Sequence, residues 1–311
     1  EGFDAMDYRY YLLGAHYRKQ LSFSREALAA AQTARHRLVE NLVENSDGKF
    51  AIATSPADVR KHFDAGVISL PMGMENGSPI DGDLANLVHF YERGIRYITL
   101  AHSLSNHISD SSYDDNRLWN GLSEFGIEVV REMNRLGIMV DVSHLSDEAF
   151  WQVLEVSAAP VIASHSSARH FTPGWERNMS DEMIRALADG GGIIMINFGS
   201  AFITEEAYQY SSKRWPASTA FIQEHSELSR EEARAQFTAA WEAEHGPMPY
   251  ASLDDVLDYL AALEERGHQA AVAAAEAKAS LPELADLRLT APEEEDDNPP
   301  TPEAESQGSG T

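Results

Sequence analysis

Between residues 66 and 198, short apolar runs alternate with amphipathic stretches, and this alternation constrains the fold more than any other feature of the chain. The apolar runs predict strands at 66–72, 95–101, 138–142, 160–164 and 192–198. The stretches between them predict helices at 84–92, 125–136, 146–156 and 180–188. Strands that alternate with helices form parallel sheets through crossover connections. Almost continuously apolar strands are typical of sheets covered on both faces. The sequence therefore predicts an α/β fold, either a closed barrel or a doubly wound sheet.

The segments on either side of this region have a different texture. Residues 3–45 carry apolar side chains at helical spacing, and Ser55-Pro56 predicts the start of a short helix that ends near Phe63. Residues 204–250 are polar and helix-prone, and Ser252 caps a further predicted helix. We accordingly divide the chain into an N-terminal helical segment (1–62), a partial barrel with the candidate site (63–203), a helical region (204–287) and an acidic, Pro-rich tail that we expect to be disordered (288–311).

The charge balance limits the classes of partner. The chain has 24 Lys and Arg residues against 50 Asp and Glu residues, a formal net charge of −26. Such a chain should repel nucleic acid and anionic membrane surfaces. It has no cysteine, which excludes disulfides, thiolate metal sites and cysteine nucleophiles. No apolar run is long enough to predict a membrane-spanning helix. We therefore expect a small molecule or a cation as the partner.

Strong polar groups follow four consecutive predicted strands. They are Glu75, His102, His144 and His165. In a barrel, the carboxyl ends of the strands meet at one mouth, where barrel enzymes place their active sites. Imidazole and carboxylate are natural ligands of a borderline divalent metal such as zinc, and a carboxylate can bridge two ions. A single histidine at a strand end is more often a core or loop residue, but four such groups in register favour a metal site.

One other segment imitates a metal site. Residues 110–116 begin like a calcium-binding loop, but Asp115 stands where the turn needs glycine and Gly121 stands where the bidentate glutamate belongs. We interpret this segment as an ordinary loop.

Four segments together resemble the membrane (renal-type) dipeptidase family, which belongs to the wider amidohydrolase group. They are YITLAHS (97–103), DVSHLSD (141–147), VIASHSSAR (161–169) and ERNMSDEMI (176–184). The resemblance covers roughly residues 63–202. It implies a TIM-type (β/α)8 barrel, of which about five of the eight strands are recognisable here.

The resemblance also implies a mechanism and a set of site residues. Glu75 would bridge two zinc ions, and His144 and His165 would bind the second ion. His102 would be the catalytic residue that contacts the substrate or the tetrahedral intermediate. Arg177 would hold the carboxylate of a dipeptide substrate, although without the family it reads as a surface arginine near a helix cap. Relatives are often periplasmic or membrane-anchored, but this is an analogy, and the location of this chain stays open. Whether the chain forms a homodimer also stays open.

The sequence departs from the family pattern in two places. The family's first strand ends in a His-x-Asp pair that binds the first zinc, and no predicted strand here ends in that pair. The Gly-Ser-Asp-Phe-Asp-Gly motif of the last strand is absent as well. Two alternatives therefore stay open: another metal-dependent amidohydrolase, or an inactive truncated relative.

Overall fold

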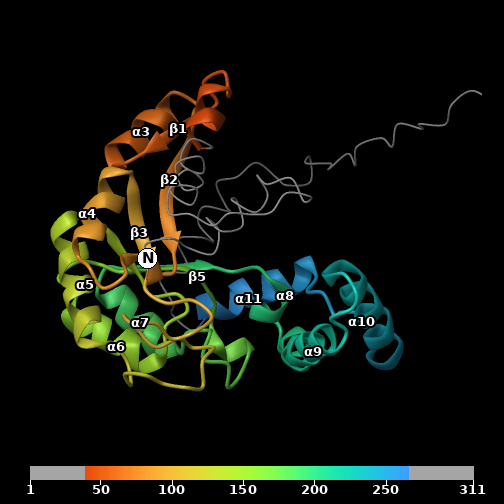
Figure 1. Cartoon of the computed structure of the whole chain (residues 1–311). Coiled ribbons are helices and arrows are strands. Elements are labelled where there is room, and N and C mark those ends of the chain that lie inside the picture. The colour runs from red at the N-terminus through yellow and green to blue at the C-terminus, as the bar shows by residue number, and fades with distance from the viewer. Residues whose placement is uncertain (1–38, 266–311) are drawn as a thin grey trace, which may run out of the picture.

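A single parallel sheet organises the part of the chain that the computed structural model describes, residues 39–265. Its strand order follows the sequence, with β1 at one edge and β6 at the other, and the sheet is curled (Figure 1). The strands are β1 (Phe50–Ala53), β2 (Ile68–Glu75), β3 (Ile95–Thr99), β4 (Met139–Asp141), β5 (Ile162–Ser166) and β6 (Ile193–Ile196). This is the arrangement of an incomplete TIM-type barrel, as the sequence predicted.

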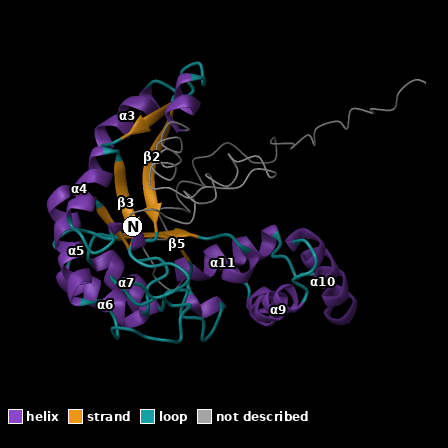
Figure 2. Ribbon diagram, viewed as in Figure 1, coloured by secondary structure: helices purple, strands orange, loops and turns teal. Residues whose placement is uncertain are grey.

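Helices connect successive strands and lie along the outer side of the curved sheet (Figure 2). They are α3 (Pro56–Asp64), α4 (Ala85–Glu92), α5 (Glu124–Leu136), α6 (Asp147–Val156) and α7 (Asp181–Asp189), with short 3-10 turns η1 (Ser78–Ile80) and η2 (Arg169–Phe171). Helix α4 packs against β3, α5 against β4 and α7 against β6.

The helix boundaries follow from capping residues that the sequence displays. Ser123, Ser146 and Ser180 each accept a hydrogen bond from the backbone N–H three residues later, at the starts of α5, α6 and α7. Asp147 lies in the first turn of α6, where the helix dipole favours a negative charge. Gly137 ends α5 with a left-handed φ of 81°. Glycine adopts this conformation at little energetic cost because it has no Cβ atom.

The core lies between the sheet and these helices. Its buried members from β3, β4, α5, α6 and the segments beside them include Ile98, Leu100, Val140, Val129, Met133, Phe150 and Val153. Burial of such side chains supplies about 1.5–3 kcal/mol each relative to exposure. The core therefore fixes the strands in register and, with them, the residues at their carboxyl ends.

The sheet has one strand more than the five predicted. Strand β1 lies within the segment expected to be helical, and it pairs in parallel with β2 from Phe50↔Ile68 to Ala53↔Pro71. With four residues, it is too short for alternating polarity to reveal it. The strand is defined by its backbone hydrogen bonds to β2, which are tertiary contacts. The predictions for residues 3–38, for the Ala-rich segment beyond 268 and for the acidic tail lie outside the described residues.

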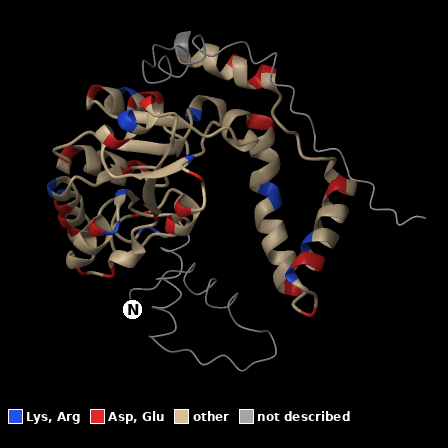
Figure 3. Cartoon of the chain, turned by 90° about the horizontal axis from the view of Figure 1, so that it is seen from above, with Lys and Arg blue, Asp and Glu red and all other residues tan. Residues whose placement is uncertain are grey.

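The helical region after β6 consists of α8 (Ser200–Ile203), α9 (Glu205–Glu224), α10 (Arg230–His245) and α11 (Leu253–Glu265). Helices α9 and α10 contact each other and extend side by side away from the sheet (Figure 3). A capping box at Ser229 and Glu232 starts α10, and Tyr259 of α11 is buried against the sheet domain. No helix of the described residues combines the length and the apolar character needed to cross a membrane.

Candidate metal centre

Four side chains from four neighbouring strands converge at the carboxyl ends of the sheet. Glu75 is the last residue of β2, His165 lies in β5, and His102 and His144 follow β3 and β4. The Oε1 atom of Glu75 lies 3.3 Å from His102 Nε2, 3.2 Å from His144 Nε2 and 3.0 Å from His165 Nε2. The structure thus brings together all four residues that we grouped from their sequence positions, with the three histidines around one oxygen of Glu75.

The histidine rings also contact one another. His144 Nε2 lies 2.8 Å from His165 Nε2, and the His102 and His144 ring centroids are 4.3 Å apart. Glu75 and His102 are half exposed, whereas His144 is only 7% exposed. The cluster is therefore closed behind His144 and open to solvent on the side of Glu75 and His102.

The environment keeps the cluster in the protonation states that bind metals. The adjacent imidazoles of His144 and then His165 hold the pKa of Glu75 well below its ordinary value. Burial lowers the pKa of His144 to about 4, although the Glu75 carboxylate acts to raise it. At neutral pH the site therefore contains a carboxylate and a neutral imidazole, the ligand forms of these side chains.

This donor set fits a divalent cation. Two ligand atoms of a tetrahedral zinc ion, each about 2.0 Å from the metal, lie about 3.3 Å apart. The separations of 3.0–3.3 Å between Glu75 Oε1 and the three Nε2 atoms are close to that value. Glu75, His102 and His144 satisfy the geometry of a three-ligand group. An imidazole lone pair and a carboxylate oxygen are both hydrogen-bond acceptors, so they repel each other at this distance. A cation between them would turn this repulsion into an attraction.

The backbone of His144 adopts an unusual conformation to present its ring. Its φ is 71°, in the left-handed region that disfavours residues with a Cβ atom. Its carbonyl accepts a hydrogen bond of 2.8 Å from Ser112 N, in the loop after β3. Its Nδ1 atom is buried and has no hydrogen-bond partner among the described residues. Strain and an unpaired polar atom at one residue are typical of a position retained for chemistry.

Arg177 is not a surface residue. It is 2% exposed, and it donates hydrogen bonds of 2.8 Å to Ser166 Oγ and 2.7 Å to the His165 carbonyl. Its Nε atom is buried without a partner, and no ion pair of Arg177 occurs within residues 39–265. Burial lowers the pKa of this guanidinium, although Tyr113, Asp141 and Glu75 act to raise it. A buried cation with an unused donor suits the binding of an anionic group.

Sequence reasoning missed two aromatic residues beside the cluster. The Tyr113 ring lies 5.7 Å from the His144 ring and 6.2 Å from the Trp175 ring. Trp175 in turn stacks on Tyr208 of α9 at 4.8 Å. Tyr113 and Trp175 lie in loops and Tyr208 lies in a distant helix, so no periodic sequence pattern indicates that they come together.

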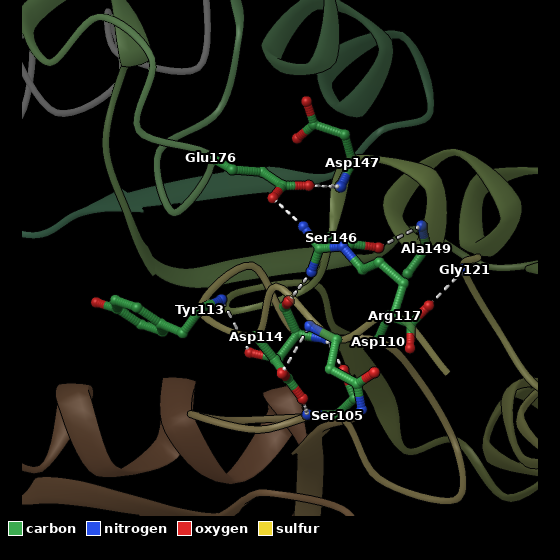
Figure 4. Close-up of polar contacts among 12 residues, drawn as sticks. Ser105, Asp110, Tyr113, Asp114, Arg117, Gly121, Ser146, Asp147, Ala149 and Glu176 are labelled. Atoms are coloured by element: carbon green, nitrogen blue, oxygen red, sulfur yellow. Dashed lines mark hydrogen bonds and ion pairs between the residues drawn. The ribbon is translucent and has the colours of Figure 1, made fainter. Parts of the chain in front are cut away.

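The loop that carries Tyr113 is the segment that imitates a calcium site, and the structure explains its acidic residues. Buried Asp110 accepts backbone hydrogen bonds from Leu118, Trp119 and Gly121, and Asp114 accepts one from Ser105 (Figure 4). These carboxylates fold the loop onto itself, as expected of Asp in turns. The interpretation as a loop agrees with these bonds.

An ion-pair network joins this loop to its neighbours. Arg117 pairs with Glu176, and Glu176 also accepts a 2.8 Å hydrogen bond from Asp147 N at the start of α6 (Figure 4). The Asp147 carboxylate forms two bonds, of 2.7 and 2.6 Å, with Arg169. The loops after β3, β4 and β5 are therefore held together at the mouth.

The sequence does contain one His-x-Asp triplet, His62-Phe63-Asp64, but it is not a strand end. It forms the last turn of α3, and His62 Nδ1 lies 2.9 Å from Ser69 Oγ, near the start of β2. Glu75 lies at the other end of the same strand. The triplet is therefore far from the cluster and offers it no ligand.

A curled parallel sheet with histidines and a carboxylate at its carboxyl ends defines a barrel protein with a candidate metal centre. The chain matches the family model of membrane dipeptidase (peptidase family M19) over residues 12–275. It belongs to this family.

Named relatives and solved structures agree with this assignment. The chain is 40% identical over 155 residues to the uncharacterized dipeptidase C3A11.10c of Schizosaccharomyces pombe, covering 50% of this chain and 38% of the relative. It is 38% identical over 161 residues to dipeptidase tcpJ of Claviceps purpurea, covering 52% of this chain and 38% of the relative. The chain thus spans well under half the length of these relatives.

Two solved structures extend the comparison. The probable dipeptidase PvdM of Pseudomonas aeruginosa superposes with a TM-score of 0.63 over 78% of this chain and 65% of that one, and at 24% identity it supports the fold alone. A metallopeptidase of Rhodobacter sphaeroides, solved with a phosphinate mimic of the dipeptide L-Ala-D-Ala, gives a TM-score of 0.52 at 29% identity, over 59% of this chain and 53% of that one.

Proposed function

We propose that this chain provides part of the active site of a zinc-dependent dipeptidase, in which Glu75 would help to hold two zinc ions. The observation that carries the proposal is the convergence of three imidazole nitrogens within 3.3 Å of one Glu75 oxygen. His144 and His165 are the proposed ligands of one ion. Family membership and dipeptidase-named relatives support the substrate class.

His102 is the proposed catalytic residue. Its side chain is 39% exposed, so it faces the open side of the cluster, where a substrate can approach. Its Nδ1 atom lies 2.8 Å from Ser103 Oγ, which leaves Nε2 directed into the site. From there it can donate a hydrogen bond to the oxygen that becomes negative as the peptide carbonyl is attacked. When bound, zinc would polarise that carbonyl and lower the pKa of a water molecule toward neutrality.

Arg177 is the proposed binding residue for the substrate carboxylate. Its charge is buried without an ion-pair partner among the described residues, and such a charge is costly until a counterion reaches it. The guanidinium can pair with a carboxylate through two hydrogen bonds. Since Arg177 lies directly behind His165, a carboxylate bound there would place the adjacent peptide bond near the cluster. This geometry favours dipeptides over longer peptides.

Metal analysis and paired substrates test the proposal on the full chain. We expect zinc to copurify or to bind on addition, and the measured stoichiometry separates one ion from two. His165→Gln should reduce zinc binding, whereas His170→Gln, an exposed histidine outside the cluster, should not. We expect hydrolysis of free dipeptides and little hydrolysis of the same dipeptides with an amidated C-terminus. A folded chain that binds no zinc would contradict the proposal, and preference for cyclic amides or lactones would favour another amidohydrolase.

A further inference from the structure

A buried carboxylate lies behind the candidate metal centre and does not contact Glu75 or the histidines directly. Asp141, the last residue of β4, is 0% exposed and accepts four hydrogen bonds. Its Oδ1 atom accepts from two backbone groups, Ser143 N at 3.1 Å and Ser164 N at 2.9 Å. Its Oδ2 atom accepts from two hydroxyls, those of Thr99 and Ser164, each at 2.5 Å. Each oxygen is thus saturated by donors, as a buried carboxylate requires.

Ser164 connects this carboxylate to a proposed metal ligand. Its Oγ atom lies 2.5 Å from Asp141 Oδ2 and 2.7 Å from His165 Nδ1. A carboxylate can only accept hydrogen bonds, so the single hydroxyl hydrogen of Ser164 is directed to Asp141. Ser164 then offers His165 only its lone pairs, and the short contact to Nδ1 requires that Nδ1 carry the ring proton.

The consequence lies on the other side of the ring. A neutral imidazole with its proton on Nδ1 has a lone pair on Nε2, and Nε2 is the atom that lies 3.0 Å from Glu75 Oε1. We propose that Asp141 is a positioning residue that acts through Ser164 to fix His165 in the Nδ1–H tautomer, and so prepares Nε2 to bind the metal. This inference rests on the proposed function, because it assigns His165 as a ligand.

His144 shows that such control is not a general property of the cluster. Its Nδ1 atom is buried with no hydrogen-bond partner among the described residues, so no group on that side of the ring directs its tautomer. Of the two proposed ligands of the same ion, His165 is therefore the one whose Nδ1 atom is held by a hydrogen bond. Hydrogen-bonded partners of metal-binding histidines typically contribute a factor of about 10–100 to metal affinity.

The structure specifies a variant that should reverse the tautomer without changing its shape. In Asp141→Asn, the two backbone N–H groups at the Oδ1 position require an acceptor, so the amide oxygen is held there. The amide NH2 group then takes the Oδ2 position and donates to Ser164. The Ser164 hydroxyl is free to donate to His165 Nδ1, which moves the ring proton to Nε2. Nε2 would then present a hydrogen toward the metal position instead of a lone pair.

Two measurements on the full chain test this. The first is a long-range 1H–15N correlation spectrum of the metal-free protein with 15N-labelled histidine, in which His165 is assigned from His165→Gln. The second is the affinity for zinc alone, measured by competition with a chelator at neutral pH. We expect the Nδ1–H tautomer in the original protein, the Nε2–H tautomer in Asp141→Asn, and a zinc affinity reduced by about 10–100-fold in that variant.

Two further variants sharpen the comparison. Ser164→Ala removes the link, so we expect mixed tautomers and a similar loss of zinc affinity; if Asp141→Asn does not fold, this variant carries the test. Thr99→Val removes a different hydroxyl from the same Asp141 oxygen but leaves the Ser164 contact, so His165 should keep its tautomer. Circular dichroism and thermal melting confirm that each variant is folded.

The outcomes separate this inference from the proposed function. An Nε2–H tautomer of His165 in the original protein, or an unchanged tautomer in both Asp141→Asn and Ser164→Ala, overturns the inference even where zinc binds. A chain that binds no zinc, or binds it equally well as His165→Gln, overturns the proposed function, and the spectrum of the metal-free protein still decides the tautomer.

Discussion

Arg177 Nη2 donates a 2.7 Å hydrogen bond to the backbone carbonyl of His165, so a buried cation lies directly behind the strand end that presents a proposed metal ligand. The same guanidinium holds Ser166 Oγ through its other terminal nitrogen. The position of β5 at the mouth and the position of the proposed carboxylate-binding group are therefore coupled. A change in one of them should be felt by the other.

Arg177→Lys should weaken substrate binding more than the chemical step. A lysine keeps the charge but cannot maintain both existing contacts and still pair with a carboxylate through two bonds. Loss of one charge-assisted hydrogen bond, about 1.5–3 kcal/mol, corresponds to a KM increase of roughly 10- to 100-fold. Steady-state kinetics with free dipeptides measure this.

Arg169→Lys is the matched control for that experiment. Arg169 belongs to the same loop region, but its guanidinium is already paired with Asp147. We expect a lower melting temperature with little change in KM. An equal KM increase in both variants would mean that Arg177 acts on the fold and not on the substrate.

The metal-free chain should lose stability between about pH 6.5 and pH 4. His144 has a pKa of about 4 in the folded chain, against 6.5 ordinarily, because burial disfavours its charged form. In that window the unfolded chain binds a proton that the folded chain does not, so the free energy of unfolding falls as the pH falls. The loss from this group is about 3 kcal/mol at most, and it is complete below pH 4. Denaturant titrations in the presence of a chelator measure it.

Glu75 acts in the same direction at lower pH. Its pKa is also depressed in the folded chain, so its contribution is present above the ordinary value of 4.5 and declines on further acidification. His144→Gln should reduce the change between pH 6.5 and 4, where His89 and His107, whose pKa values burial also lowers, still contribute. It should also reduce the part below pH 4.5, because the His144 contact is the first cause of the depressed Glu75 pKa. A profile that is equally steep in this variant would show that His144 does not cause the effect.

Gly126→Ala should destabilise the fold. Gly126 lies in the first turn of α5, and an added Cβ would be only 2.1 Å from the Ile108 carbonyl oxygen. Overpacking of this kind costs about 1–3 kcal/mol. Gly190→Ala is the control, because its Cβ would be 3.4 Å from its nearest neighbour, an ordinary contact. Thermal melts of the two variants should differ, and equal melting temperatures would contradict the close approach.

Glu176→Gln should loosen the loop after β3. The substitution keeps an acceptor for Asp147 N but removes the charge that pairs with Arg117. Backbone amides that Asp110 holds, such as those of Leu118 and Gly121, should exchange hydrogen faster, by a larger factor than amides of α5. Hydrogen-exchange mass spectrometry measures this, and unchanged exchange in the loop would mean that Asp110 alone fixes it.

Local patterns made the central part of the fold predictable. The serine caps of α6 and α7 and the apolar strands β2 to β6 are signals carried by adjacent residues, and the structure confirms these elements near the expected bounds. The clustering of Glu75 with the three histidines follows from those elements, because parallel neighbouring strands bring their carboxyl ends together.

The missed features depend on contacts between distant parts of the chain. Strand β1 exists through its pairing with β2, and the four residues FAIA carry no alternation of their own. The depth of Arg177 and the position of Tyr113 depend on how the loops close, and Arg117 and Glu176, which join those loops, are 59 residues apart. No sequence window contains that information. The His62-Phe63-Asp64 triplet shows the reverse case, in which a short match lies in a helix and has no role at the cluster.

The left-handed backbone of His144, at φ 71°, has a consequence for how such a chain can change over generations. A residue with a Cβ atom in this conformation costs on the order of 1 kcal/mol, and glycine would occupy it without that penalty. Replacement of His144 by glycine would therefore relieve the backbone strain, but it would also remove an imidazole from the cluster. Where a histidine persists here, its chemistry has outweighed the relief that its loss would bring.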